Sequence, residues 1–207
     1  MNDPIIFIFQ LITLILSVVI HEVSHGLIAH RLGDNTAKDM GRLTLNPVKH
    51  LDFFGSFLFP FTLFLFGSPI LFGWAKPVPY NPSNLKDPQK GGGLIAAAGP
   101  VSNLAVAAVF GVILKIFSAT SLITSPAILF LQIIILVNVS LAIFNLVPIP
   151  PLDGSKILFA FLPSRYMKAQ VFFERYGFLL LLLFIFFGIR LIQPLILKLF
   201  TFLGGGF

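Results

Sequence analysis

Residues 5–20 read IIFIFQLITLILSVVI and carry no charge. The sequence HEVSH follows directly at residues 21–25, and the apolar pattern continues to Leu32. A helix needs about 20 apolar residues to cross the hydrocarbon core of a membrane. The stretch therefore predicts a membrane-spanning helix near residues 5–31, with the ionisable groups His21, Glu22 and His25 inside its second half. Its acidic start and its lack of a small-residue cleavage site predict that it is not a cleavable signal peptide.

The composition of the whole chain agrees with a membrane protein. Of 207 residues, 57% are hydrophobic and 11% are charged, whereas a soluble domain has about 25% charged residues. The chain has no cysteine, which excludes disulfides, thiolate metal ligands and a thiol nucleophile. The net charge of +6 is explained by lysine and arginine in cytoplasmic loops, without nucleic acid as a partner.

Gaps between the charged residues predict four crossings, near residues 5–31, 91–117, 127–148 and 177–201. The connection 118–126 has no charge, whereas the other polar connections are basic. The positive-inside rule therefore places both termini and this connection outside the cell. The basic connections expected in the cytoplasm are residues 31–52, 76–90 and 156–175.

The uncharged segment 53–75 lies between two basic connections. A full crossing would put these connections on opposite sides, so the segment is interpreted as a re-entrant hairpin or membrane-surface element, broken near Pro60 and at Gly67-Ser68-Pro69. A fifth crossing is the alternative. Residues 41–47, GRLTLNP, alternate in polarity and predict a short strand. The predicted fold is an all-α polytopic membrane protein with four to five transmembrane helices, a membrane-associated β element and a re-entrant segment, in one domain over residues 1–207.

The HEVSH sequence carries the candidate chemistry. His21 and His25 are four residues apart, so both extend from one face of a helix and can hold one metal ion. Glu22 lies at the edge of that face, where it can act as a general base. The alternative to a metal site is a solvated helix end that happens to carry two histidines and a glutamate. Ionisable groups inside a membrane span favour function.

Asp153 is the favoured third ligand, because it is the only charge between residues 116 and 155. Pro148, Pro150 and Pro151 prevent a continuous helix before it. Asp153 can also cap a new helix, and one carboxylate can do both. The ionisable groups ranked below it, each with an ordinary polar or ion-pairing explanation, are His30, Asp34, Asp39, His50, Asp52 and Glu174.

Two asparagines complete the candidate site. Asn145 ends an apolar stretch eight residues before Asp153, where it can bond a substrate peptide or an oxyanion. A helix C-cap is its alternative role. Asn103 belongs to GPVSN, residues 99–103, whose small neighbours favour close helix packing. Its side chain can still face the site.

These residues together resemble the site-2 proteases, a family of zinc intramembrane metalloproteases. The resemblance is carried by HEVSHG at 21–26, GPVSN at 99–103 and NLVPIPPLDG at 145–154, which occur in the same order. HEVSHGLIAHRLGD from residue 21, GRLTLNP from residue 41 and FGWAKPVP at 72–79 are similar to the short bacterial and archaeal branch without a PDZ domain. The resemblance covers residues 1–165, and the crossing at 177–201 carries no motif.

The resemblance implies a role for each matching residue. His21, His25 and Asp153 match the ligands of one Zn²⁺ per chain, and Glu22 matches the catalytic base. Asn145 matches an asparagine that contacts the substrate backbone near the scissile bond. The expected substrate-binding residues also include Asn103 and a strand that pairs with the unwound substrate, formed by Arg42, Leu43, Thr44 and Leu45.

The expected function is zinc-dependent endopeptidase activity on peptide bonds within or near transmembrane helices. The expected partners are transmembrane protein substrates and the lipid bilayer. The expected location is the cell membrane, with the active site toward the cytoplasm. A non-catalytic membrane binding protein of the same fold is the first alternative, although no ligand or base is missing. A metal transporter is the second, although only one helix is clearly broken, at residues 148–151.

Overall fold

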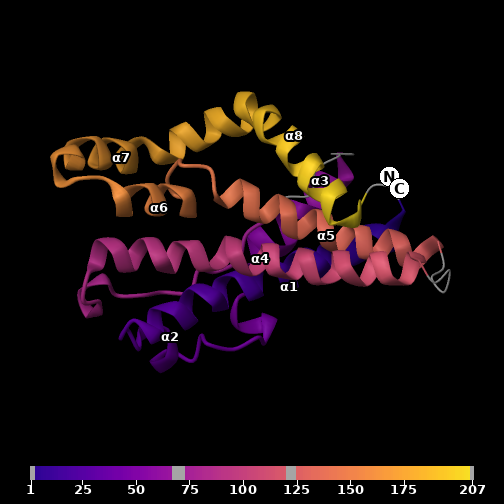
Figure 1. Ribbon diagram of the computed structural model, residues 1–207, viewed down its shortest axis with the longest axis horizontal. Coiled ribbons are helices and arrows are strands. Elements are labelled where there is room, and N and C mark those ends of the chain that lie inside the picture. Colours follow the sequence, from indigo (N-terminus) through magenta and orange to yellow (C-terminus); the bar gives the residue numbers. More distant parts are fainter. Residues whose placement is uncertain (1–2, 67–72, 120–124, 206–207) are drawn as a thin grey trace.

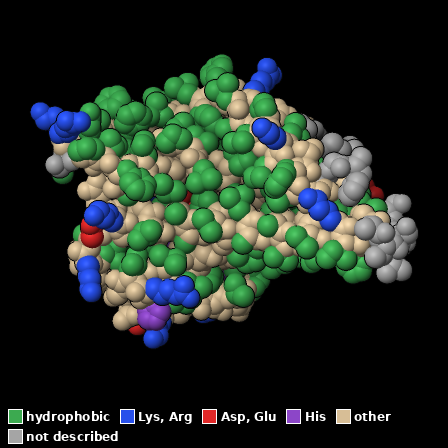
Figure 2. Space-filling view, viewed as in Figure 1, with side chains coloured by type: hydrophobic (Ala, Val, Ile, Leu, Met, Phe, Trp, Pro, Cys, Tyr) green, Lys and Arg blue, Asp and Glu red, His purple; other side chains and the backbone are tan. Residues whose placement is uncertain are grey.

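The computed structural model describes residues 3–66, 73–119 and 125–205. Within these ranges, four helices are long and apolar enough to cross a membrane: Pro4–Arg31, Pro88–Ser118, Pro126–Asn145 and Met167–Gly204. One face of the molecule is covered mainly by hydrophobic side chains, with lysine and arginine more sparsely placed (Figure 2). The prediction of an all-α polytopic membrane protein is confirmed.

The first three spans are single helices and the fourth is composite. It begins at residue 167, ten residues before the predicted start, and π-helical turns interrupt it. The helices are α1 (Pro4–Arg31), α2 (Thr36–Asp39), α3 (Phe59–Leu65), α4 (Pro88–Ala119), α5 (Ser125–Asn145), α6 (Asp153–Phe161), α7 (Met167–Leu183) and α8 (Ile189–Phe200), with π-helical turns at Phe54–Leu58, Phe184–Gly188 and Thr201–Gly205 and 3-10 turns at Pro47–Lys49, Pro82–Asn84 and Ser164–Tyr166.

Local chemistry defines both ends of α1. Asp3 caps its first turn by accepting a hydrogen bond from the Ile5 amide at 2.8 Å, and Pro4 occupies the first helical position, where a missing N–H costs least. His30 and Arg31 lie in the last turn, where basic groups interact favourably with the helix dipole. The chain then turns at Gly33, whose φ of 107° favours glycine.

Helices α1, α4 and α5 form the centre of the molecule, and α7 and α8 arch over it (Figure 1). The buried core between α4 and α5 is apolar, and side chains of α8 pack against it. Figure 1 places the two termini at one end, while α2 and the connection from α6 to α7 lie toward the other. The predicted topology requires the termini to lie on the same side. The fully buried core residues include Ala107, Leu114, Ile135 and Val139.

The two described ends of the segment 53–75 lie next to each other. Its described helical part, Phe54–Leu65, spans about 18 Å at 1.5 Å per residue, too short for a core of about 30 Å. The Trp74 amide donates to the Gly55 carbonyl at 3.1 Å, and the Ser56 hydroxyl donates to the Trp74 carbonyl at 2.9 Å. These contacts favour the re-entrant interpretation. The predicted break at Gly67-Ser68-Pro69 lies outside the described residues.

The predicted strand at residues 41–47 is not formed, and none of the described residues is in a strand. Backbone groups of this segment bond locally and not to a neighbouring strand. The Arg42 amide donates to the Ala37 carbonyl at 2.8 Å, and the Asn46 amide donates to the Thr44 hydroxyl at 3.2 Å. Alternating polarity does not mark one buried face here, because Leu43 packs against α1 at Gly26 whereas Leu45 is exposed.

Asp34 ties the loop after α1 to the segment before α4. Its side chain is fully buried and accepts hydrogen bonds from the Thr36 hydroxyl at 2.6 Å, the Asn81 amide at 2.9 Å and the Asn84 side-chain amide at 2.7 Å. Burial alone would raise the pKa of this carboxyl, but the hydrogen bonds hold the pKa below its ordinary value. The ionised carboxylate therefore stabilises this junction.

We expect Asp34→Asn to lower the free energy of unfolding by about 2 kcal/mol at neutral pH, because hydrogen bonds to a charged acceptor are weakened or lost. Since the folded pKa is depressed, the contribution of Asp34 is complete above its unfolded pKa of about 4 and is lost as pH falls through the folded pKa. Thermal unfolding in detergent should therefore show a gap between wild type and variant that narrows in acid. Asp39→Asn is the control, because Asp39 is an exposed carboxylate on the neighbouring helix α2. Parallel pH curves for wild type and Asp34→Asn would contradict the assignment.

Candidate metal centre

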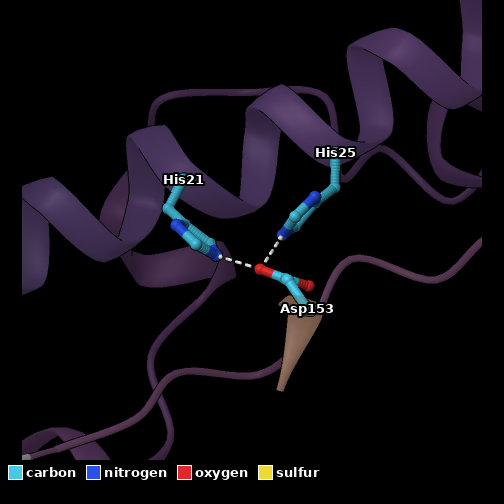
Figure 3. Close-up of side chains that lie close together, drawn as sticks. All are labelled: His21, His25 and Asp153. Carbon is cyan, nitrogen blue, oxygen red and sulfur yellow. Dashed lines mark hydrogen bonds and ion pairs between the residues drawn. The ribbon is translucent and has the colours of Figure 1, made fainter. Parts of the chain in front are cut away.

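The structure brings together three of the residues singled out in the sequence. His21 and His25 are buried on one face of α1, and both imidazoles point toward the Asp153 carboxylate (Figure 3). Asp153 Oδ2 lies 3.0 Å from His21 Nε2 and 3.3 Å from His25 Nε2. Candidate ligand atoms of all three residues lie within 4.8 Å of one another. This spacing suits a single ion.

Asp153 reaches the histidines because the chain breaks after α5. A segment with a cis Pro150–Pro151 peptide bond leads to α6, whose first residue is Asp153. Gly154 lies so close to the Leu146 and Val147 carbonyls that a Cβ atom would collide with them. The Asp153 side chain is buried and turned toward α1. Glycine at residue 154 therefore allows the close approach that places the carboxylate.

The other nitrogen of each imidazole contacts a carbonyl oxygen. His25 Nδ1 lies 2.6 Å from the Ile95 carbonyl, and His21 Nδ1 lies 2.6 Å from Asn103 Oδ1. A carbonyl oxygen only accepts, so each Nδ1 carries a hydrogen, and in the neutral imidazole that binds a metal each Nε2 then presents a lone pair. Two nitrogen lone pairs and one carboxylate oxygen then converge at a buried site. A bound cation would supply the positive charge that all three of these atoms lack as a partner. Two imidazoles and one carboxylate fit a catalytic zinc site with an open fourth position.

Gly99 of α4 forms the floor under the two histidines. A Cβ atom built at this position would lie 2.5 Å from His21 Cε1 and Nε2, and 2.6 Å from His25 Cε1. Real Cβ atoms do not approach other heavy atoms this closely, so only glycine leaves the imidazoles where they are. The sequence indicated close helix packing around this residue. The structure shows that the packed neighbours include the candidate metal ligands.

Glu22 lies beside the three ligands and is held by the backbone. Its Oε2 accepts a hydrogen bond from the Val78 amide at 2.8 Å. Glu22 lines a cavity of about 160 Å³ together with the candidate ligands. The cavity is large enough to hold water. Its described lining residues are His21, Glu22, His25, Pro77, Val78, Tyr80, Ile95, Ala96, Asn145, Pro151, Asp153 and Lys156.

Arg42 supports the extended segment that carries Val78. Its guanidinium donates to the Lys49 carbonyl, to the Lys76 carbonyl at 3.2 Å and to the Pro77 carbonyl at 3.3 Å. Leu43 packs close to α1 at Gly26. The four expected strand residues, 42–45, are not among the described residues that line the cavity. The structure therefore places them in a supporting loop behind its wall.

The two candidate asparagines lie in different places. Asn145 lines the cavity, and its side-chain amide donates back to the Leu141 carbonyl at 3.0 Å, which leaves its second amide hydrogen for another acceptor. Asn103 is fully buried behind His21 and is not among the described lining residues. Its position suits a contact with His21, a candidate metal ligand, better than a contact with a substrate.

Two polar contacts of the site were not found from the sequence. The Val78 amide is a backbone group, and no residue type announces it. Asn138 is fully buried and bonds Asn103 at 2.9 Å. A signal for Asn138 was present, because it is a polar residue in the apolar span α5 and lies seven residues, two helical turns, before Asn145.

Comparisons with known proteins identify the family of this chain. The profile of Peptidase family M50 matches residues 113–187. A Bacillus subtilis protein named "Putative zinc metalloprotease YwhC" is 40% identical over 179 residues, covering 84% of this chain and 78% of the relative. "Putative zinc metalloprotease MJ0611" of Methanocaldococcus jannaschii is 31% identical over 157 residues, covering 74% and 71%. "Zinc metalloprotease MJ0392" of the same organism is 27% identical over 191 residues, covering 91% and 45%.

The search of solved structures gave no significant match. The family is nevertheless shown by the curated relatives, because two of them are at least 30% identical and are covered over more than two thirds of their length. The resemblance inferred from the three motifs is confirmed. The helices identify a multi-pass membrane protein, and the chain belongs to peptidase family M50, the family of the site-2 proteases.

Proposed function

We propose that this protein is a zinc-dependent endopeptidase of the HExxH type that cleaves peptide bonds within or near transmembrane helices of other proteins. The observation that carries the proposal is the convergence of His21 Nε2, His25 Nε2 and Asp153 Oδ2, with the Glu22 carboxylate lining the same cavity. Membership of a metalloprotease family supports the general activity. The position of the site within a membrane helix supports the choice of substrate.

The candidate site lies within α1 and not at its end. His21 is ten residues before Arg31, the last residue of α1, which corresponds to about 15 Å along the helix axis. A bond cleaved there belongs to a segment that has entered the membrane. The basic connections lie toward the same end of α1, so we place the site toward the cytoplasm and the protein in the cell membrane.

Each residue has a task that follows from its atoms. When bound, zinc supplies a Lewis acid that polarises a peptide carbonyl and lowers the pKa of water. Glu22 takes a proton from the attacking water and returns it to the leaving amine, and the Val78 amide holds the carboxylate in place. Asn145 offers an amide hydrogen to the substrate carbonyl oxygen. Gly99 keeps the space beneath both imidazoles free.

Cleavage of a reporter membrane helix by purified protein in liposomes tests the proposal. We expect a metal chelator to stop cleavage and added zinc to restore it. Loss of an outer-shell partner weakens metal binding by up to roughly 100-fold. Asp153→Ala removes a ligand itself, so it should weaken zinc binding by more than this factor and should abolish cleavage. Mass spectrometry of the fragments should place the cut in or beside the reporter's apolar segment. Asp39→Ala is the matched carboxylate control, because Asp39 is exposed on α2.

Three results would contradict the proposal. Cleavage that persists after complete removal of zinc would exclude the metalloprotease assignment. Cleavage restricted to soluble peptides, with no cut in the membrane helix under any lipid condition, would leave a metalloprotease and reject the intramembrane substrate. Metal uptake into sealed liposomes without any proteolysis would favour a transporter.

A further inference from the structure

Two asparagine side chains connect three membrane helices behind His21. Asn103 of α4 and Asn138 of α5 are both fully buried. The side-chain amide of Asn103 donates to Asn138 Oδ1 at 2.9 Å and to the Ser17 carbonyl of α1 at 3.1 Å. Buried polar side chains in a membrane span are costly and commonly mark function. Asn138 has no task in the proposed mechanism.

The direction of every hydrogen bond in this group follows from donors and acceptors. Asn138 Nδ2 donates to the Ile134 carbonyl at 2.9 Å, so its Oδ1 faces Asn103. Both hydrogens of Asn103 Nδ2 are then used, by Asn138 and Ser17, and Asn103 Oδ1 is left facing His21 Nδ1 at 2.6 Å. The opposite amide orientation would set the Asn103 oxygen against two other oxygens. His21 must therefore donate from Nδ1.

We infer that Asn138 and Asn103 are positioning residues that act in series on His21. Asn138 fixes the amide orientation of Asn103, and Asn103 fixes both the tautomer and the ring angle of His21, so that Nε2 is free for the metal. This inference rests on the metal site of the proposed function. It assigns to Asn103 a role different from the substrate contact expected from the sequence.

His25 provides an internal contrast. Its Nδ1 donates to the Ile95 backbone carbonyl at 2.6 Å, so its tautomer is set by the backbone of α4. His21 reaches the same state only through two side chains on two helices. Substitution of Asn103 or Asn138 can therefore disturb His21 and leave the Ile95 carbonyl, the partner of His25, intact.

A purely structural role makes a different prediction from a positioning role. Hydrogen bonds between membrane helices contribute on average about 0.6 kcal/mol to stability, so replacing asparagine with leucine of similar size should change unfolding only modestly. Loss of an outer-shell partner typically reduces metal affinity or activity 10- to 100-fold. Metal affinity and metal geometry therefore separate the two roles better than stability does.

The test compares full-length wild type, Asn103→Leu, Asn138→Leu and Ser102→Ala in detergent at one fixed pH. Ser102 is the matched control, because it neighbours Asn103 and bonds only its own helix, at the Gly99 carbonyl. Competition with a chromophoric chelator gives the zinc dissociation constant. The visible absorption of the Co²⁺-loaded protein at saturation reports the geometry of the bound metal, and a change in stability alone would not alter it.

We expect Asn103→Leu to weaken zinc binding about 10- to 100-fold and to change the Co²⁺ spectrum. Asn138→Leu should change both readouts in the same direction by a smaller factor, because Asn103 remains. Ser102→Ala should match wild type. If Asn103→Leu does not fold, Asn138→Leu decides the question, since Asn138 does not touch His21.

Wild-type zinc affinity and an unchanged Co²⁺ spectrum in both leucine variants would overturn the inference. That result would leave the proposed function standing if wild type still cleaves membrane helices. Conversely, the protein could bind metal in a way that depends on the asparagines and yet cleave nothing. That result would reject the proposed function and keep the inference. A wild-type protein that binds neither Zn²⁺ nor Co²⁺ would reject both.

Discussion

Glu22→Gln is expected to keep zinc bound and to reduce cleavage of a membrane helix by about 10²- to 10⁴-fold, the usual contribution of a general base. Glutamine has the same shape and can still accept the hydrogen bond that the Val78 amide gives to Glu22, so the wall of the cavity should stay in place. Its side chain cannot take a proton from water. The Glu22 carboxylate is also not one of the three convergent ligands, so metal binding should survive.

Single-turnover cleavage of a reporter helix and zinc content by mass spectrometry measure the two halves of this result. His21→Ala is the companion variant and should lose both zinc and cleavage, because it removes a ligand. A Glu22→Gln protein that cleaves at the wild-type rate would show that the general-base assignment is wrong. The same variant addresses the transporter alternative, because transport of metal would not depend on Glu22.

Gly99→Ala adds only one methyl group but should weaken zinc binding by roughly 100-fold or more. This is beyond the usual effect of a change outside the metal ligands. The new Cβ would lie 2.5 Å from His21 Nε2 and 2.6 Å from His25 Cε1, so at least one imidazole must rotate away from Asp153. Alanine also favours a helix more than glycine does. Loss of zinc should therefore occur in a protein whose α4 remains helical.

Gly92→Ala is the matched control for this prediction. Gly92 also lies in α4, but a Cβ atom there would meet only the Tyr80 hydroxyl at an ordinary 3.5 Å. Equilibrium zinc titration and circular dichroism of both variants separate an effect on the site from an effect on the helix. Zinc affinity equal to wild type in Gly99→Ala would show that the imidazoles can move without leaving the metal.

The sequence was sufficient to predict the residues that now lie together, for physical reasons. Spacing of four residues places His21 and His25 on one helical face, and a lone charge in an apolar region singles out Asp153. Membrane spans are long and uncharged, so their positions could also be predicted well. The predicted fourth span began at residue 177 and α7 begins at Met167, because charged residues can continue a helix beyond the apolar region.

The rest depended on contacts that no local pattern describes. The alternation in residues 41–47 predicted a strand, but a strand needs a partner, and Arg42 instead bonds the carbonyls of Lys76 and Pro77 across 34 and 35 residues of chain. The role of Gly99 depends on which helix it faces. Asn138 acts on His21 only through Asn103, so its contribution could not be read from spacing within one helix.

The distance along the chain between His21 and Asp153, 132 residues, affects when the protein can become active during its synthesis. A ribosome makes both histidines early, when α1 enters the membrane, but the carboxylate is added only after α4 and α5 have been made. Until then the growing polypeptide has two of its three metal donors. A nascent chain that has not yet reached Asp153 thus lacks the third donor, and under the proposed function such an unfinished copy would not cleave.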